Sequence, residues 1–264
     1  MEEISLPGGV ELVLDENRRT ARVRLDRPDV RNAQTMATWS ALARAADLIR
    51  ARDAISVVVL SGAGPDFSAG LDLRMLRGDA PAGEGDVREL LGRDDAGVRG
   101  AIADFQRGFT CWRELPAIVV AVITGRAVGA GFQLALAADL RILSEDAVLV
   151  MAEARLGLVP DLGGTRRLME IVGYAHALEI CATAGPVDAH RAERLGLANA
   201  VVPNEDLDAA VERQLDALRA VDPVVSRAVK TLMVGATAST PAEQLAAERA
   251  AQVPLLRKIT GTSG

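Results

Sequence analysis

Two glycine-rich stretches constrain this 264-residue chain more than any other feature. They run over Ser61–Leu73 (SGAGPDFSAGLDL) and Ile123–Ile142 (ITGRAVGAGFQLALAADLRI), and in each an apolar, strand-like run leads through small residues into a helix-like segment. The first residues of a helix leave backbone N–H groups without intrahelical acceptors, and these groups can bind an anion or an oxygen that becomes negative. Two such elements can hold one carbonyl oxygen from both sides, as an enzyme that stabilises an enolate requires.

Hydrophobic periodicity along the chain predicts an α/β fold. Apolar and β-branched runs predict strands over residues 11–15, 20–26, 55–60, 117–124, 139–144, 148–151 and 201–202. Apolar residues at helical spacing predict helices over residues 35–52, 98–115, 131–138, 174–184 and 189–195, with a further helix starting at residue 164. The strand–turn–helix unit of the glycine-rich stretches occurs twice within this order.

The strand signals end near residue 203. Beyond it, residues 205–220, 223–234 and 241–258 are predicted to be helical, two of them starting at Pro as helices often do. We therefore divide the chain into a mixed α/β core, residues 1–203, and a helical segment, residues 204–264. The apolar faces of that segment indicate that it packs on a neighbouring copy of the chain. Residues 78–97, rich in Gly, Pro and Asp, are predicted to form a mobile flap.

Charge and composition argue against several functional classes. The formal net charge is −6 and no basic stripe interleaved with aromatic residues occurs, so a nucleic-acid surface is not expected. No window approaches eighteen uninterrupted apolar residues, so no membrane span is expected. The N-terminal segment MEEISLPGGV lacks the features of a signal peptide, and we expect a cytoplasmic protein. His176 and His190 have no partners at metal-ligand spacing, which argues against a metal site.

Two carboxylates follow the second glycine-rich stretch, within MAEARLGLVPDLGGT (151–165). Glu153 stands in apolar company just past a predicted strand, and Asp161 follows a proline in a loop that leads to a helix. Carboxyl groups in apolar surroundings tend to have raised pKa values, which suits proton transfer near neutral pH. The residues alone are also compatible with structural roles, namely a solvated Glu153 and an Asp161 that caps the following helix.

Four motifs in order give the chain a family resemblance. RPDVRNA (27–33), FSAGLDL (67–73), VGAGFQLALAADLRI (128–142) and RLGLVPDLGGTRRL (155–168) resemble the crotonase superfamily of enoyl-CoA hydratases and isomerases. The resemblance extends from about residue 10 to the C-terminal helices. It implies a spiral of ββα units with a C-terminal helical domain and a homotrimer or homohexamer. It also implies an acyl-CoA thioester substrate, with coenzyme A as part of the substrate and no separate cofactor.

The resemblance also implies roles for individual residues. The backbone N–H groups of Leu71 and Ala130 would form the oxyanion hole, and alanine in place of the family's usual glycine at 130 leaves that amide intact. Lys258 would reach a coenzyme A phosphate in a neighbouring subunit. The remaining contacts to coenzyme A would come from six residues of the first two motifs: Arg27, Arg31, Ala33, Ala69, Asp72 and Leu73.

Three positions bear on the reaction. Family hydratases use two glutamates, twenty residues apart, to hold the water that adds to the double bond, and here these positions are Gln133 and Glu153. A glutamine orients water but does not exchange protons at neutral pH. Asp161 matches an acidic residue of the family's isomerases. The dienoyl-CoA type also matches Glu153, whereas its third acidic residue falls at Gln133.

The sequence leaves three functions open. The first is isomerisation of an enoyl-CoA double bond in fatty-acid or related catabolism, with Asp161 as the stronger candidate for the base and Glu153 as the other carboxylate. The second is hydration of a 2-enoyl-CoA by Glu153 with help from Asp161. The third is an acyl-CoA-binding regulator without turnover, which Gln133 favours and the two carboxylates oppose. Residues 78–97 and 98–115 are expected to line part of the acyl pocket.

Overall fold

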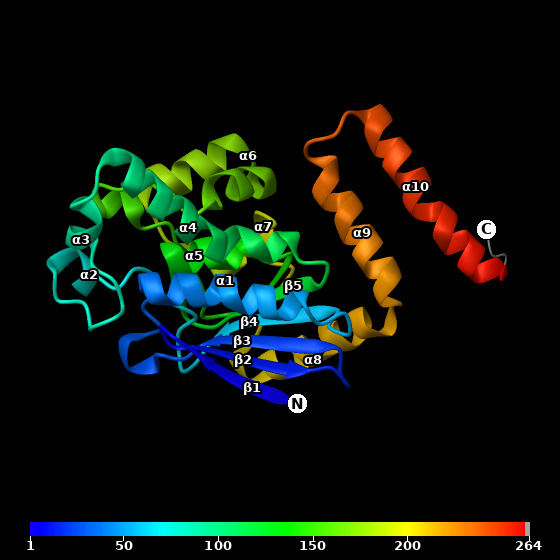
Figure 1. Cartoon of the computed structure of the whole chain (residues 1–264), viewed down its shortest axis with the longest axis horizontal. Helices are drawn as coiled ribbons and strands as arrows, with labels where there is room; N and C mark the ends of the chain where they lie inside the picture. Colours follow the sequence, from blue (N-terminus) through cyan, green and yellow to red (C-terminus); the bar gives the residue numbers. More distant parts are fainter. Residues whose placement is uncertain (262–264) are drawn as a thin grey trace.

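A seven-stranded sheet forms the base of the fold in the computed structural model, which describes residues 1–261 (Figure 1). The strand order is β1-β2-β3-β4-β5-β7-β10; β1 and β2 are antiparallel to their neighbours and the other pairs are parallel. The central strands are almost continuous runs of Val, Ile and Leu because both of their faces are buried. The strands are β1 (Glu2–Leu6), β2 (Val10–Asp15), β3 (Thr20–Leu25), β4 (Val57–Gly62), β5 (Ile118–Ile123), β7 (Leu140–Ser144) and β10 (Ala200–Val202).

A second, three-stranded sheet gives the core its repeated layout. It has the order β6-β8-β9, formed by Arg126–Val128, Val148–Val150 and Val187–Asp188. Strand β5 of the large sheet is followed by β6 of the small one and then by helix α5 (Ala130–Ala137). In the same way β7 is followed by β8, a short 3-10 helix and α6 (Gly164–Thr183). Successive strand–strand–helix units therefore stack on one another, which confirms the predicted α/β fold class.

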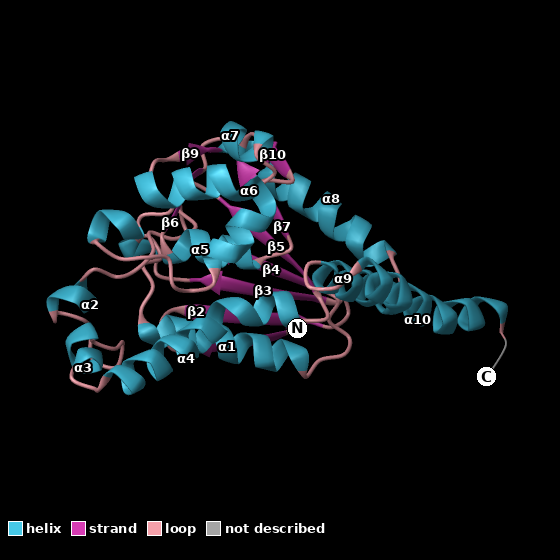
Figure 2. Cartoon of the chain, turned by 90° about the horizontal axis from the view of Figure 1, so that it is seen from above, coloured by secondary structure: helices cyan, strands magenta, loops and turns pink. Residues whose placement is uncertain are grey.

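Helices cover the sheet (Figures 1 and 2). The long helices α1 (Met36–Arg50) and α4 (Asp95–Glu114) pack along each other, and the Trp39 ring lies 5.1 Å from Phe105 and 6.2 Å from Phe109 between ring centroids. The remaining helices are α2 (Arg74–Arg77), α3 (Val87–Leu91), α7 (Ala189–Arg194), α8 (Leu207–Ala220), α9 (Pro223–Ala236), α10 (Pro241–Thr260) and the 3-10 turns η1 (Pro28–Val30), η2 (Glu153–Leu156) and η3 (Asn204–Asp206).

The structure differs from the sequence-based elements at several places. The short elements α2, β6 and β9 were not predicted. Strand β1 was not predicted, because its five mixed residues become a strand only by pairing antiparallel with β2. The two helices predicted around 164 and 174–184 form one element, α6, which breaks at Gly173 where φ is 77°. The predicted flap, residues 78–97, contains the short helix α3, which begins at an Asp86 cap.

The C-terminal helices divide into one that covers the sheet and two that form a hairpin. Leu207, Val211 and Leu215 of α8 pack on β4, β5 and β7. In this hairpin α9 contacts the body of the molecule and α10 projects beyond it (Figures 1 and 2). Lys230, midway along α9, anchors the hairpin: its Nζ lies 2.7 Å from an Asp139 carboxylate oxygen and donates to two backbone carbonyls.

Large apolar side chains on this hairpin are exposed, Met233 on α9 and Leu245, Val253, Leu256 and Ile259 on α10. They are compatible with the predicted contact between copies of the chain, which stays a prediction. The predicted division of the chain into residues 1–203 and 204–264 also stays a prediction. Within residues 1–261, no helix has both the length and the apolar character needed to cross a membrane.

Candidate active site

The two glycine-rich segments lie against each other, backbone to backbone. Ser68 pairs with Ala127 in a short parallel bridge, with its N–H donating to Arg126 O and its carbonyl accepting from Val128 N. Gly70 has φ 83°, and a Cβ built there would stand 2.3 Å from Val128 O. Only glycine permits both this backbone conformation and this approach.

This contact brings the two predicted oxyanion amides to one cavity. Leu71 follows Gly70, and Ala130 is the first residue of α5, where N–H groups have no intrahelical acceptor. Within residues 1–261 neither amide donates to a protein acceptor, whereas their neighbours Gly70 N and Asp72 N donate to Ser68 Oγ and Gln34 O. Both residues line the same cavity, so the arrangement fits a pair of donors for one oxygen.

A buried polar network holds the first segment in place. Gln34 Nε2 donates to Ser68 Oγ at 3.0 Å, and Trp39 Nε1 donates to Gln34 Oε1 at 3.0 Å. Ser68 Oγ in turn donates to Asn32 O at 2.8 Å. Sequence reasoning missed this network, because nothing in the spacing of these polar residues indicates that they meet.

The cavity between the segments has a volume of about 330 Å³ and contains most of the residues predicted for catalysis and binding. Its walls come from α1, the two glycine-rich segments, α5 and the loop that joins β8 to α6. The lining residues are Trp39, Ala69, Leu71, Leu73, Val128, Gly129, Ala130, Gln133, Ala152, Glu153, Arg155, Leu156, Leu158, Val159, Asp161 and Leu162.

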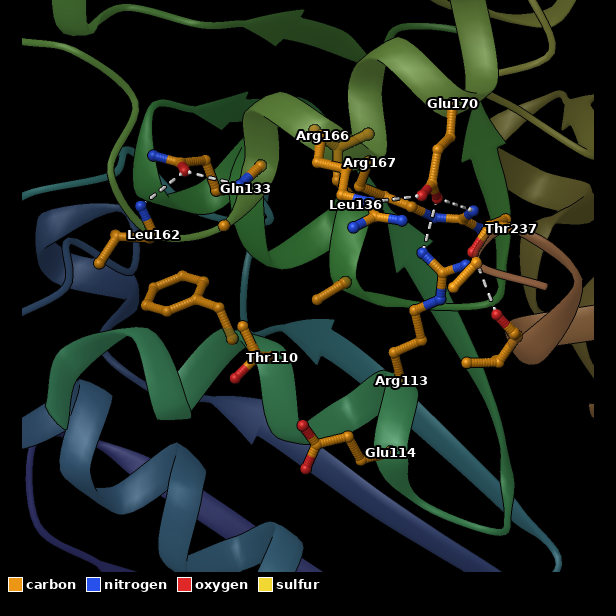
Figure 3. Close-up of a pocket in the computed structure, with 16 residues that line it drawn as sticks. Thr110, Arg113, Glu114, Gln133, Leu136, Leu162, Arg166, Arg167, Glu170 and Thr237 are labelled. Atoms are coloured by element: carbon orange, nitrogen blue, oxygen red, sulfur yellow. Dashed lines mark hydrogen bonds and ion pairs between the residues drawn. The ribbon is translucent and has the colours of Figure 1, made fainter. Parts of the chain in front are cut away.

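The side-chain amide of Gln133 is fixed by three hydrogen bonds at the inner wall of this cavity. Its Oε1 accepts from the backbone N–H of Leu162 at 3.0 Å and of Gly164 at 3.2 Å, contacts that Figure 3 marks. Two N–H donors fix the orientation of the amide, so Nε2 faces Glu153 and donates to Glu153 Oε1 at 2.7 Å. Gln133 is buried, 1% exposed, and its Nε2 holds Glu153 Oε1 in place.

Glu153 lies in the wall of the cavity and has one carboxylate oxygen without a partner in the described chain. The residue starts η2 directly after β8 and is 9% exposed, and its Oε2 is buried without a hydrogen-bond partner in the described chain. A Cβ placed on Gly129 would lie 3.4 Å from Oε1, so the carboxylate stands beside the start of α5. Burial raises the pKa of Glu153, and the negative charge of Asp161 raises it further against the hydrogen bonds that lower it.

Asp161 supplies a second carboxylate at the same cavity. It is exposed, yet partial desolvation by its surroundings raises its pKa above the ordinary value. The Gln106 side chain donates to Asp161 O at 2.7 Å and ties the loop to α4. The cavity thus combines two free backbone donors with two carboxylates of raised pKa, the set needed to stabilise an enolate and to move protons to and from it.

Comparison with known families decides the identity of this arrangement. A family model described as enoyl-CoA hydratase/isomerase matches residues 15–260. The chain belongs to the enoyl-CoA hydratase/isomerase family. The resemblance to crotonases drawn from the four motifs is therefore confirmed, and the chain is an enzyme of that superfamily.

Relatives of this family member carry both hydratase and isomerase names. A peroxisomal Δ(3,5)-Δ(2,4)-dienoyl-CoA isomerase of Arabidopsis thaliana is 31% identical over 80% of this chain and 75% of its own length. A Rhodobacter capsulatus protein assigned as an enoyl-CoA hydratase is 37% identical over 71% of this chain and 67% of its own length. A Thermobifida fusca protein assigned as an enoyl-CoA hydratase, solved with acetoacetyl-CoA, is 42% identical with a TM-score of 0.89, covering 95% of this chain and 96% of that one.

Of the residues predicted to bind coenzyme A, Ala69 and Leu73 line the hydratase/isomerase cavity. The others, apart from Lys258, contact one another or Ala69. Arg27 donates to Ala33 O at 2.7 Å and lies 3.4 Å from Asp72 Oδ2. Arg74, which the sequence did not single out, also pairs with Asp72, at 2.6 Å, and these contacts lower the pKa of Asp72. Arg31 has φ 53° and accepts at its carbonyl from Ala69 N.

Lys258 is the exception in position. It lies on α10, which projects from the body of the molecule in Figure 1, and its Nζ pairs with Asp222 at 2.6 Å. Its predicted contact involves a neighbouring subunit, so the single chain does not test it.

Proposed function

We propose that this enzyme moves a carbon–carbon double bond within an enoyl-CoA thioester. The thioester carbonyl would accept hydrogen bonds from the N–H groups of Leu71 and Ala130. Coenzyme A would lie along Arg27, Arg31, Ala33, Ala69, Asp72 and Leu73. The acetoacetyl-CoA and CoA complexes of the Thermobifida fusca relative support a ligand of this class.

The observation that carries the choice of reaction is the fixed amide of Gln133, whose oxygen has both acceptor positions in use. Each of its polar atoms already has a protein partner, two backbone N–H groups on Oε1 and Glu153 Oε1 on Nε2. A hydratase of the two-glutamate type needs a second carboxylate here to hold and deprotonate the attacking water. Gln133 offers neither charge nor a free acceptor, which favours a reaction that moves protons without adding water.

The proposed reaction needs two proton transfers. Glu153 Oε2 removes a proton from the carbon next to the thioester carbonyl, and the C–H electron pair enters a dienolate whose negative oxygen the two amides stabilise. The dienolate then takes a proton at the far end of the former double bond, so a 3-enoyl-CoA becomes a 2-enoyl-CoA. Protonated Asp161 delivers that proton. Afterwards Glu153 releases the proton that it took and Asp161 takes up another, both by exchange with solvent, so that each carboxyl group returns to its starting form.

This assignment differs from the sequence-based ranking, which put Asp161 first as the base. Glu153 stands beside Gly129 at the start of α5, and so beside the carbonyl that acidifies the adjacent proton. Its unpaired oxygen is buried, whereas Asp161 is exposed. A buried carboxylate with raised pKa is a stronger base, and proximity to the carbonyl assigns it the first transfer.

Replacing Asp161 with Asn tests the assignment of Glu153 as the base and Asp161 as the proton donor. We expect D161N to lower kcat for double-bond migration by roughly 10²-fold, because one of two proton-transfer groups is lost. It should also remove the basic limb of the kcat/KM–pH profile. The mechanism needs a protonated Asp161, whose raised pKa sets that limb, and an asparagine at this position does not titrate.

The measurement is ultraviolet absorbance of the conjugated product across pH, with D208N, an exposed Asp on α8, as the matched control. A D161N profile identical to that of D208N contradicts the assignment.

Hydration of a 2-enoyl-CoA is the second candidate, because several relatives carry that name and Glu153 is present. Binding without turnover is the third function left open by the sequence. Hydration would give 3-hydroxyacyl-CoA as the product. Binding without turnover would show affinity for acyl-CoA and no product. A homotrimer or homohexamer stays a prediction, which the mass of the protein in solution tests.

A further inference from the structure

A second cavity lies behind the inner wall of the catalytic cavity. It has a volume of about 360 Å³ and is formed by α4, α5, α6 and the end of α9 (Figure 3). Its apolar part includes Phe109, Leu136 and Val234. At its far end Arg113, Arg166 and Arg167 surround Glu170, as Figure 3 shows.

Just two residues, Gln133 and Leu162, line both cavities in the described chain. They form the wall between the two spaces, and we call them the partition. The partition is tightly built: Leu162 is 5% exposed, and its N–H donates to Gln133 Oε1. A Cβ built on Gly164 would stand 2.8 Å from Gln133 Cγ. The Gly164 backbone is therefore packed against the Gln133 side chain, which cannot move toward the second cavity.

The reacting carbons of a substrate would lie against this partition. Glu153 Oε1 is bonded to Gln133, and Asp161 is the residue before Leu162. Gln133 also lies one turn beyond Ala130 on the same face of α5, three residues on from the oxyanion amide. The acyl chain would start at the carbonyl held by the oxyanion amides and pass between the two carboxylates. It would therefore reach the partition after a few carbons.

We propose that the partition, and Leu162 in particular, sets the acyl length that this enzyme accepts. The substrate is then a short or compact acyl group, and longer chains are excluded by the wall although an apolar space lies behind it. This inference rests on the proposed acyl-CoA ligand. It does not depend on which reaction the carboxylates carry out.

Replacing Leu162 with Ala opens the partition and keeps its backbone contact to Gln133. The probes are saturated acyl-CoA esters from butanoyl to dodecanoyl, which are not turned over by double-bond migration, with Kd measured by titration calorimetry. Each methylene that enters an apolar space raises affinity roughly fourfold. For the wild type we expect this gain to stop at a short chain length.

For L162A we expect the gain to continue by at least two methylenes, so affinity for the longer esters rises on the order of tenfold relative to the wild type. L162V should move the length limit by an intermediate amount. It provides the same test if L162A does not fold. The matched control is L158A, which removes an equal side chain from the catalytic cavity away from the partition, where Leu158 is 45% exposed.

The outcomes separate the inference from the proposed function. Wild-type affinity that keeps rising through dodecanoyl-CoA overturns the inference, and a matching loss in L158A would then show that the chain leaves over the exposed loop. The same length limit in the wild type and both Leu162 variants also overturns it. Absence of binding by every ester overturns instead the acyl-CoA ligand on which the inference rests.

Discussion

Replacing Glu153 with Gln is expected to lower kcat for double-bond migration by about 10²- to 10⁴-fold, the range that a positioned general base contributes. Glutamine keeps the size of the side chain, and its carbonyl can still accept from Gln133 Nε2, as Glu153 Oε1 does at 2.7 Å. The buried oxygen that lacks a partner, Oε2, becomes an amide nitrogen that takes no proton. The loss should appear in kcat while the Kd for a saturated acyl-CoA changes little.

The control is E145Q, the same substitution at an exposed glutamate outside the cavity. Unfolding midpoints of both variants establish that any loss of rate is chemical. If E153Q retained the wild-type kcat, Glu153 would not be the base, and the assignment of the first proton transfer would be wrong.

Replacing Gly70 with Ala should produce the second large effect, a fall in kcat/KM of about 10²- to 10³-fold, as expected for displacing an oxyanion donor. The added Cβ would stand 2.3 Å from Val128 O, so the two glycine-rich segments must separate. Because Leu71 N directly follows this position, its N–H moves away from Ala130 N. The measurement is kcat/KM together with the thermal midpoint.

The chain offers a matched control in Gly83, which has φ 82° but no atom within 4 Å of a built Cβ. G83A carries the same backbone strain as G70A, of about 1–3 kcal/mol, without the contact. We expect G83A to keep its activity. Equal losses of kcat/KM in the two variants would attribute the effect to backbone strain and contradict the role of the close approach.

The chemistry-bearing residues of the site were predictable because each stands in a locally marked segment. Leu71 and Ala130 follow small-residue turns, and Glu153 and Asp161 are carboxylates in apolar surroundings. The strands around them are apolar runs that fix the fold class. These signals are local, and the fold brings all four residues to one cavity.

The parts that sequence reasoning missed depend on contacts between distant segments. In the sequence, Leu162 is an apolar loop residue with no distinguishing feature. Its place in the wall between the two cavities depends on its contact with Gln133 of α5. Gln34 becomes a support for the oxyanion loop through contacts to Ser68 and Trp39 that no spacing rule encodes. The sequence did not decide whether Gln133 orients water in a hydratase or marks a protein without turnover. Its three hydrogen bonds form with segments up to 31 residues away, which the sequence does not show.

We propose that Gln133 and Glu153 make this enzyme an isomerase that moves protons and not a hydratase that adds water. The most direct test incubates the full chain with 3-enoyl-CoA, and separately with 2-enoyl-CoA, in oxygen-labelled water and identifies the products by mass spectrometry. We predict conversion between the 3-enoyl and 2-enoyl esters with no label incorporated. Labelled 3-hydroxyacyl-CoA as the main product would contradict the claim.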